Sequence, residues 1–324
     1  MNRILLGVTG DVMIGRLVNE TLTNVDPKWA WGDLHPLLAS THYNFANLET
    51  TLTRRGEPQT KTFTFRADPE QVAVLKSGGI QGVNLANNHV LDYGQEGLVD
   101  TLEALRRARI GLVGAGKNIE AARRPLQMRC GGVQIGLVGA TDNEPGWAAT
   151  ANKPGTHYLS MRDPTPLLED LSTVECDWTA VTLHWGPNMV ERPPIHFRHF
   201  AHALTRGGVR LIHGHSAHCF QGIETMNGAL ILYDTGDFLD DYAVNPSLRN
   251  DLSFFYLIEV DEKGPCRLAC IPTAISNCQV NHAQGDDREF AFERMIRLSA
   301  ELHTDLSLAT SGLFDGPHLE LILR

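Results

Sequence analysis

Short apolar runs of strand length alternate along the chain with segments whose apolar residues recur at helical spacing. The strand candidates are 3–8, 80–85, 133–139, 178–184, 209–213, 229–234 and 253–260. The helix candidates lie near 12–22, 68–78, 95–109, 195–206 and 286–302. Such alternation is typical of the α/β class, in which helices cover the faces of a sheet. We therefore predict an α/β protein.

The segment 95–109 shows the helical spacing most clearly. Leu98, Thr101, Leu102 and Leu105 stand at i, i+3, i+4 and i+7, which places them on one side of a helix. We expect this side to pack on a sheet.

The chain shows no internal repeat, low-complexity tract or clear linker, so we predict one main domain over 1–285 with a C-terminal helical extension, 286–324, packed on it. Residues 141–175 are richer in Pro, Gly, Asn and Thr than their surroundings. That composition is typical of a loop excursion, here at the rim of the domain or as a lid.

The composition is that of a globular protein, with 42% hydrophobic and 20% charged residues in 324. It excludes a disordered chain and a collagen-like or coiled-coil architecture. The formal net charge is −10. Because phosphate groups are bound largely by Lys and Arg, this charge argues against nucleic-acid partners and anionic membranes.

The first residues and the cysteines bear on the compartment. The apolar run from Arg3 to Val8 is too short for a secretory leader, and no stretch reaches the ~18 apolar residues of a membrane span. The six cysteines are scattered and include no Cys-x-x-Cys pair. We expect reduced, buried cysteines and a cytoplasmic protein without a membrane anchor.

Polar residues recur where the predicted strands end: Asp11, Asn87-Asn88-His89, His184, His215 with His218, and Asp237. Each alone has an ordinary explanation, since a single buried histidine is commonly structural and Gly-Asp after a strand is commonly a turn. Five in one chain favour a site, because loops after parallel strands converge. Imidazole, carboxylate and amide ligands together suit divalent Zn, Mn or Fe.

These residues belong to an ordered set of motifs. In chain order they are Gly10-Asp11-Val12-Met13, Asn47-Leu48-Glu49-Thr50, Ala86-Asn87-Asn88-His89-x-x-Asp92-Tyr93-Gly94, His184-Trp185-Gly186 and Gly214-His215-x-x-His218. The set resembles the CapA (poly-γ-glutamate capsule biosynthesis) family of the calcineurin-like metallophosphoesterase superfamily. The resemblance extends from about residue 4 to about 285 and implies an αββα sandwich, two β-sheets flanked by helices.

The resemblance also implies a role for each matching residue. Asp11 corresponds to the carboxylate on a first metal ion and Glu49 to the bridging carboxylate. Asn88, His184 and His215 correspond to ligands of a second ion, and His218 returns to the first. His89 takes the place of the histidine that protonates a leaving group, and Asp92 orients it. Two cations at such a site generate hydroxide and stabilise transferring charge.

Three departures from the superfamily pattern concern the first ion. Met13 stands where histidine is usual, and thioether sulfur is a poor ligand for hard divalent ions. Glu49 replaces aspartate, and two residues separate His215 from His218 instead of one. His213 is therefore an alternative metal ligand in place of either His215 or His218. The number of ions, one or two, stays open.

Other polar residues have two interpretations each. Arg16, Lys61 and Arg66 are candidates for binding an anionic substrate, or ordinary salt-bridge residues. Asp237, Asp240 and Asp241 either support the histidines from behind or lie in solvent. His196, His199 and His202 repeat every third residue on a predicted helix, and we expect them to lie on its solvated face.

The expected activity is metal-dependent, hydrolase-like chemistry on a small-molecule, peptide or polyanionic substrate such as poly-γ-glutamate or a phosphoester. Phosphoester hydrolysis, amide hydrolysis and proton transfer at a peptide Cα all suit this apparatus. The alternative is a non-catalytic accessory protein of polymer or capsule biosynthesis. Met13 favours that alternative, whereas the pair His89 and Asp92 argues against it, because a binding protein needs no proton donor.

Overall fold

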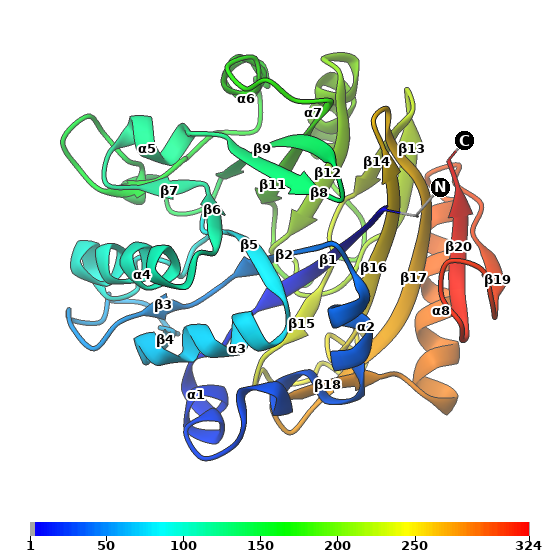
Figure 1. The fold of residues 1–324 in the computed structure, drawn as a ribbon, viewed down its shortest axis with the longest axis horizontal. Coiled ribbons are helices and arrows are strands. Elements are labelled where there is room, and N and C mark those ends of the chain that lie inside the picture. The colour runs from blue at the N-terminus through cyan, green and yellow to red at the C-terminus, as the bar shows by residue number, and fades with distance from the viewer. Residues whose placement is uncertain (1–3, 324) are drawn as a thin grey trace.

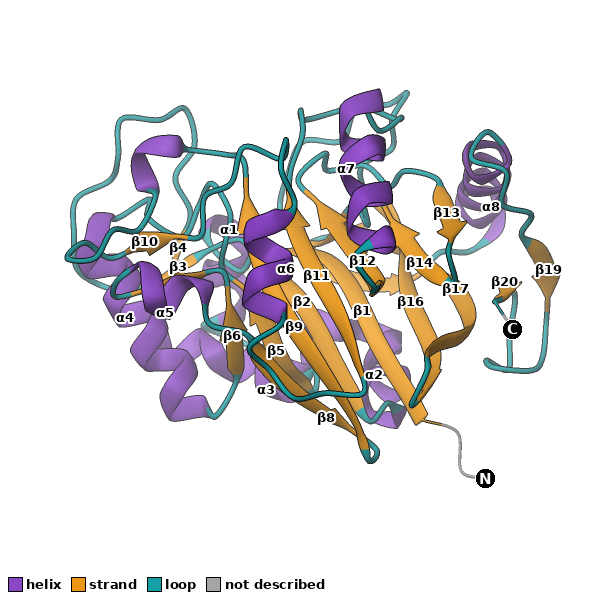
Figure 2. Ribbon diagram, turned by 90° about the horizontal axis from the view of Figure 1, so that it is seen from above, coloured by secondary structure: helices purple, strands orange, loops and turns teal. Residues whose placement is uncertain are grey.

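Two mixed β-sheets lie face to face, and helices cover their outer faces (Figures 1 and 2). The computed structural model describes residues 4–323. The predicted α/β sandwich of two sheets flanked by helices is confirmed. Within 4–323, no helix combines the length and the apolar character needed to cross a bilayer.

The larger sheet has ten strands, and it is parallel in one half and antiparallel in the other. Its path is β19 (Ser307–Ala309), β20 (His318–Ile322), β17 (Gly264–Ser276), β16 (Leu252–Asp261), β1 (Ile4–Val12), β2 (Tyr43–Leu48), β5 (Ile80–Asn84) and β6 (Gly111–Val113). Two further strands join it, β15 (Asp237–Leu239) beside β1 and β18 (Gln279–His282) beside β17.

The second sheet has six strands, and only its two edges pair antiparallel. Its order is β13 (Ile223–Met226), β14 (Ala229–Leu232), β12 (Val209–His215), β11 (Trp178–His184), β9 (Val133–Thr141) and β8 (Leu126–Cys130). Two short pairs complete the strands, β3 (Thr51–Leu52) with β4 (Arg66–Ala67) and β7 (Ala115–Gly116) with β10 (Gly155–Thr156).

The helices are mostly short. Those that precede β6 in the chain are α1 (Arg16–Leu22), η1 (Pro27–Leu34), α2 (His35–Ser40), η2 (Pro69–Gln71), α3 (Val72–Ser77) and α4 (Gly94–Ala108). The later ones are α5 (Ile119–Arg123), η3 (Pro145–Trp147), α6 (Thr165–Leu171), α7 (Ile195–Arg206) and α8 (Gly285–Ala300). Figure 2 shows α6 and α7 over the outer face of the second sheet.

Alternation along β16 shows how both faces of a strand become core. Phe254 and Tyr256 pack in the layer between the sheets, together with residues of β11 and β12. Phe255 and Leu257 point the other way, into the layer between the first sheet and its helices. Because both faces are buried, the run from Phe254 to Ile258 is apolar throughout, as is usual for a covered sheet.

Several predicted boundaries differ from the structure, and the central strand β2 had no prediction. The helix expected over 12–22 starts only at Arg16, because β1 continues to Val12. Strand β2, the neighbour of β1, carries Asn44 and Asn47 within its apolar run. These buried amides interrupt the hydrophobic pattern and hide the strand.

Among the described residues of the predicted extension, 286–323, only α8 is helical. Strands β19 and β20 extend the larger sheet beyond β17. Residues 307–322 therefore contribute strands to the sandwich. Residues 141–175 contain η3, β10 and α6, and β10 pairs with β7, so this excursion has secondary structure of its own.

Candidate metal centre

The carboxyl ends of parallel strands bring the predicted ligands together. On the first sheet, Asp11 lies opposite Asn47 of β2 and Asp237 of β15. On the second sheet, the last residues of β11 and β12, His184 and His215, lie opposite each other. The two groups meet between the sheets, where the loops that follow parallel strands converge.

The carboxylates of Asp11 and Glu49 are fully buried. One oxygen of Asp11, Oδ2, and both oxygens of Glu49 have no hydrogen-bond partner. Burial raises the pKa of Asp11, and burial together with the Asp11 charge raises the pKa of Glu49 well above its usual value. Such unpartnered acceptors are costly in a protein interior unless a cation or proton occupies the space between them.

The imidazoles of His184 and His215 face these carboxylates. The Nε2 atom of His184 lies 2.9 Å from Oδ1 of Asn88 and 3.9 Å from Oε1 of Glu49. The Nδ1 atoms of His184 and His215 are 2.9 Å apart, and Nδ1 of His215 is 3.8 Å from Oδ1 of Asp11. Burial lowers the pKa of both histidines well below the usual value, so both are neutral and able to bind a metal.

His218 lies on the other side of Asp11. Its Nδ1 atom is 2.8 Å from Oδ1 of Asp237 and 3.5 Å from Oδ2 of Asp11. Burial by itself lowers the pKa of His218, but the charges of Glu49 and Asp11 outweigh it and raise the pKa. Asp237 had two interpretations, and its complete burial excludes the solvated one.

Two groups of side chains fit a divalent ion within the described residues: Asp11 with His184 and His215, and Asp11 with His218 and Asp237. The mixture of carboxylate and imidazole donors suits Zn, Mn or Fe, and the unpartnered oxygens provide the negative charge. Asp11 is common to both groups. Glu49 and Asn88 stand beside the first group, within 3.9 Å of His184.

His89 forms a pair with Asp92 at the edge of this cluster. The His89 Nδ1–H donates to Oδ2 of Asp92 at 2.5 Å, which leaves Nε2 free, 3.8 Å from Oε1 of Glu49. Phe65 stacks on the imidazole with 3.9 Å between ring centroids. Burial lowers the pKa of His89 to about 4, so the ring is neutral at pH 7. Asp92 also accepts from Lys61 at 2.9 Å, which holds the carboxylate in place.

Three asparagines without a predicted role orient the cluster from behind. The amide of Asn47 donates to Oδ1 of Asp11 at 2.7 Å. Its own oxygen accepts from Asn84 at 2.9 Å and from Asn87 at 3.1 Å, which fixes the direction of the amide. Asn87 also caps the backbone of His89 at 3.0 Å. A lone asparagine inside an apolar strand is the sequence signal that marks Asn47 and Asn84.

A cavity of about 310 Å³ opens beside His89 and His218. Arg16 lies in its wall, with its guanidinium 5.7 Å from the ring centres of Phe63 and Phe65. The remaining lining residues are Phe63, Phe65, Asn188, Met189, Tyr242, Ala243 and Asn250. The hydroxyl of Tyr242 is buried without a hydrogen-bond partner, although no motif pointed to this residue.

The other two predicted substrate-binding cations lie away from this cavity. Lys61 binds Asp92 and the Asn88 carbonyl, and it stacks over Trp147 of η3 at 4.8 Å. The guanidinium of Arg66 lies 4.5 Å from the ring centre of Tyr93. Lys61 therefore supports His89 from behind. Arg16 alone of the three lines the cavity, and its guanidinium also forms an ion pair with Asp241 at 3.4 Å.

The remaining alternatives are resolved by burial and contacts. Asp240 is buried like Asp237, whereas Asp241 accepts from the Leu17 amide at 2.9 Å. On α7, His196 and His199 are exposed as predicted, but His202 binds the buried carboxylate of Glu224 at 2.9 Å. These last groups lie outside the metal cluster.

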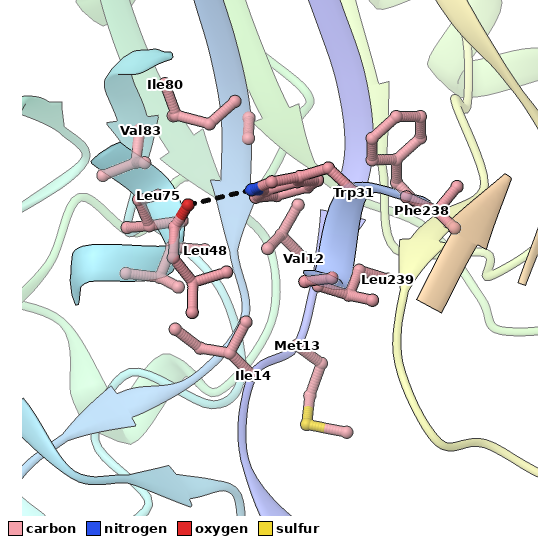
Figure 3. Packing of buried hydrophobic residues seen from close by; sticks show 14 of the residues in the cluster. Val12, Met13, Ile14, Trp31, Leu48, Leu75, Ile80, Val83, Phe238 and Leu239 are labelled. Atoms are coloured by element: carbon pink, nitrogen blue, oxygen red, sulfur yellow. Dashed lines mark hydrogen bonds between the residues drawn. The ribbon is translucent and has the colours of Figure 1, made fainter. Parts of the chain in front are cut away.

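Met13 belongs to a hydrophobic cluster (Figure 3). Its side chain is fully buried near Val12 and Ile14, and its sulfur accepts from the Gly15 amide at 3.1 Å. The thioether is therefore part of the packing.

We expect Met13→Leu to leave the affinity for Mn²⁺ unchanged, because the thioether is engaged elsewhere. A volume-conserving change of this kind costs less than about 1.5 kcal/mol of unfolding free energy. Calorimetric titration with Mn²⁺ and urea denaturation measure the two quantities. Asp11→Asn is the control that loses binding. A tenfold loss of affinity in Met13→Leu would show that the sulfur is a ligand.

The fold and the site define a class of protein, a two-sheet sandwich with a buried carboxylate–histidine centre. Residues 5–242 match the family described as "Bacterial capsule synthesis protein PGA_cap". The chain belongs to this family, as the predicted resemblance to CapA implied.

Curated relatives agree with the assignment. A Mycobacterium tuberculosis (strain H37Rv) protein named "probable polyglutamine synthesis accessory protein" is 33% identical over 92% of this chain and 83% of its own length. The "PGA biosynthesis protein CapA" of Bacillus subtilis (strain 168) is 30% identical over 72% of this chain and 62% of its own. The "capsule biosynthesis protein CapA" of Bacillus anthracis is 29% identical over 74% and 60%.

Solved structures overlap with the chain at low identity. A 5′-nucleotidase precursor from Thermus thermophilus is 12% identical, covers 93% of this chain and 59% of its own, and gives a TM-score of 0.48. The sulfate thiohydrolase SoxB from the same species is 12% identical. The match covers 87% of this chain and 46% of SoxB and gives a TM-score of 0.45.

Proposed function

We propose that the protein is a divalent-metal-dependent hydrolase that acts on an anionic substrate. Poly-γ-glutamate is the first candidate, because the family and its curated relatives are named for capsule and PGA biosynthesis. A phosphoester is the second. One observation carries the proposal: the free Nε2 of His89 borders both the unpartnered Glu49 carboxylate and the open cavity.

The side chains divide into those that hold a cation and those that act on substrate. Asp11, His184 and His215, with Asn88 and Glu49 beside them, would hold one ion, and Asp11, His218 and Asp237 a second. A bound ion would lower the pKa of a water molecule and polarise the scissile group.

Proton transfer falls to His89. The neutral ring accepts a proton at Nε2 and returns it to the leaving group, while Asp92 stabilises the transient imidazolium through Nδ1–H. Arg16 at the cavity wall would pair with a carboxylate or phosphate of the substrate. The apolar walls formed by Phe63 and Phe65 would exclude water around that pair.

The test compares poly-γ-glutamate with bis(p-nitrophenyl) phosphate, each with purified protein and Mn²⁺. We expect Mn²⁺-dependent cleavage of at least one substrate. Glu49→Gln is expected to lower that rate by about 100-fold or more, since even indirect partners of a metal are worth ~10–100-fold. Release of glutamyl fragments or of nitrophenol measures the rate.

A second candidate function is binding without catalysis, because one curated relative is named as an accessory protein. Full Mn²⁺ binding with no cleavage of either substrate, and equal background in Glu49→Gln, would overturn the hydrolase proposal in favour of that function. Cleavage rates that differ between the wild type and Glu49→Gln would contradict binding without catalysis.

A further inference from the structure

A row of polar side chains lies behind His215 on the inner face of the second sheet. In the register of β11 and β12, Thr182 lies opposite His213, and His184 opposite His215. Because side chains two residues apart share a face, all four point into the layer between the sheets. Thr182 and His213 are buried, although the proposed function uses neither of them.

The Thr9 carbonyl at one end of this row sets the direction of its hydrogen bonds. The Nε2 atom of His213 lies 2.9 Å from the backbone carbonyl of Thr9, which accepts only, so His213 carries its proton on Nε2. Its Nδ1 is then an acceptor, 3.1 Å from the Thr182 hydroxyl, which donates to it. The same hydroxyl oxygen lies 2.9 Å from Nε2 of His215 and must accept from it.

This direction of the hydrogen bonds requires that His213 is neutral, and the groups around its ring favour the neutral form. The ring is buried, and its polar contacts are the Thr9 carbonyl and the Thr182 and Thr235 hydroxyls, none of which is a carboxylate. The neighbouring Thr235 hydroxyl donates to the Gly214 carbonyl at 2.9 Å, so towards His213 it offers only an acceptor. No donor competes with Thr182 for Nδ1 of His213 among the described residues.

We propose that Thr182 and His213 are positioning residues that fix His215 in its Nε2–H tautomer. The lone pair of His215 Nδ1 then faces Asp11 and His184, at 3.8 Å and 2.9 Å. The inference rests on the proposed function in one respect, because this direction matters only if a cation is bound there. We call this chain of hydrogen bonds, from the Thr9 carbonyl through His213 and Thr182 to His215, the relay. It crosses the layer between the two sheets, from the β1 backbone through β12 and β11 to the metal cluster.

Without the Thr182 hydroxyl, His215 loses the partner that selects its tautomer. The proton is then free to move to Nδ1, where it would occupy the lone pair that a metal needs. Neutral imidazole in water carries its proton on either nitrogen, so the fixed tautomer is a contribution of the protein. Partners of this kind are worth ~10–100-fold in metal affinity.

The first experiment uses metal-free protein with ¹⁵N-labelled histidine. Long-range ¹H–¹⁵N NMR spectra distinguish protonated from unprotonated ring nitrogens, and His215→Gln assigns the signal. We expect the wild type to show His215 protonated on Nε2, Thr182→Ser to show the same, and Thr182→Val to show a mixture. A wild-type His215 protonated on Nδ1 would overturn the relay.

The second experiment titrates the same proteins with Mn²⁺. We expect a ~10–100-fold loss of affinity in Thr182→Val and recovery in Thr182→Ser. Thr273→Val is the matched control, because Thr273 is a buried strand residue of β17 whose hydroxyl has no hydrogen-bond partner. Equal affinity of Thr182→Val and Thr273→Val would overturn the proposal.

The two experiments separate the two proposals. If the wild type shows the expected tautomer but binds no Mn²⁺, the metal-dependent function fails and the relay stands. If it binds Mn²⁺ with the other tautomer, the relay fails and the function stands. Should Thr182→Val not fold, the wild-type and Thr182→Ser spectra still decide the direction of the relay.

Discussion

Replacing His89 by glutamine is expected to lower kcat by about 10²–10⁴-fold, the usual contribution of a general acid–base group. Glutamine fills similar space but cannot take up and release a proton at pH 7. Metal affinity should stay within about threefold, because no candidate group of ligands contains His89. The Mn²⁺-dependent rate on the better of the two substrates and a calorimetric titration provide the two measurements.

Asp92→Asn tests the other member of the His89–Asp92 pair. An asparagine amide can donate to Nδ1 of His89, which would move the ring proton to Nε2 and remove the free acceptor beside Glu49. A wrong tautomer with intact geometry is a recognised cause of large losses in kcat. We therefore expect this variant to approach His89→Gln in rate.

His157→Gln is the matched control, since His157 is a buried histidine that faces Asp170 at 3.8 Å, outside the metal cluster. It should retain nearly the wild-type rate. Equal rates for the wild type and His89→Gln would remove His89 from the reaction.

The second large effect is a pH-dependent stability that a divalent ion reverses. Burial raises the pKa of Asp234 and of Asp240 to about 7, and it raises the pKa of Glu49 well above its usual value. The folded protein thus binds more protons than the unfolded chain, and the free energy of unfolding falls as pH rises through these values.

Buried histidines act in the opposite direction but in a lower range. The pKa of His213 falls to about 4, so its contribution to stability is lost as pH drops below ~6.5 and is complete above it. Between pH ~6.5 and ~8 the raised pKa values of the buried carboxyls act together with that of His218, which is also raised, and all of these contributions are lost as pH rises. We expect the metal-free protein to lose at least ~1 kcal/mol over this window.

Saturating Mn²⁺ should restore this loss, since binding at ~100 times Kd adds ~2.7 kcal/mol. Urea denaturation at both ends of the window, with and without Mn²⁺, measures the effect. In Glu49→Gln both the pH dependence and the gain from Mn²⁺ should shrink. A metal-free protein that becomes more stable towards pH ~8 would contradict the assignment of these buried acids.

Much of the candidate site was accessible from the sequence because its residues follow apolar strands. Asp11, Asn88, His89, His184, His215 and His218 all gather at the predicted strand ends. Helix α7 and strand β11 have the predicted bounds, since their apolar spacing is regular from end to end.

Other parts depend on contacts that no local pattern encodes. Strand β2 was missed because its two asparagines break the apolar run, yet both are paired in the fold. Asn44 donates to the Leu38 carbonyl of α2, and Asn47 donates to the Asp11 carboxylate of β1. Met13 suggested a weak ligand, whereas in the structure its side chain is buried in a hydrophobic cluster and its sulfur accepts from the Gly15 amide. The direction of Arg16 and Lys61 likewise depends on where their aromatic neighbours lie.

The position of Asp11 between strands β2 and β15 has a mechanical consequence. An ion held by Asp11, His184 and His215 would join the two sheets. It would also join residues that lie more than half of the chain apart in sequence. It would act as a reversible cross-link that closes a long loop and holds the two sheets together. The sheets would then separate only after the ion leaves, so metal exchange would report on the opening of the sandwich.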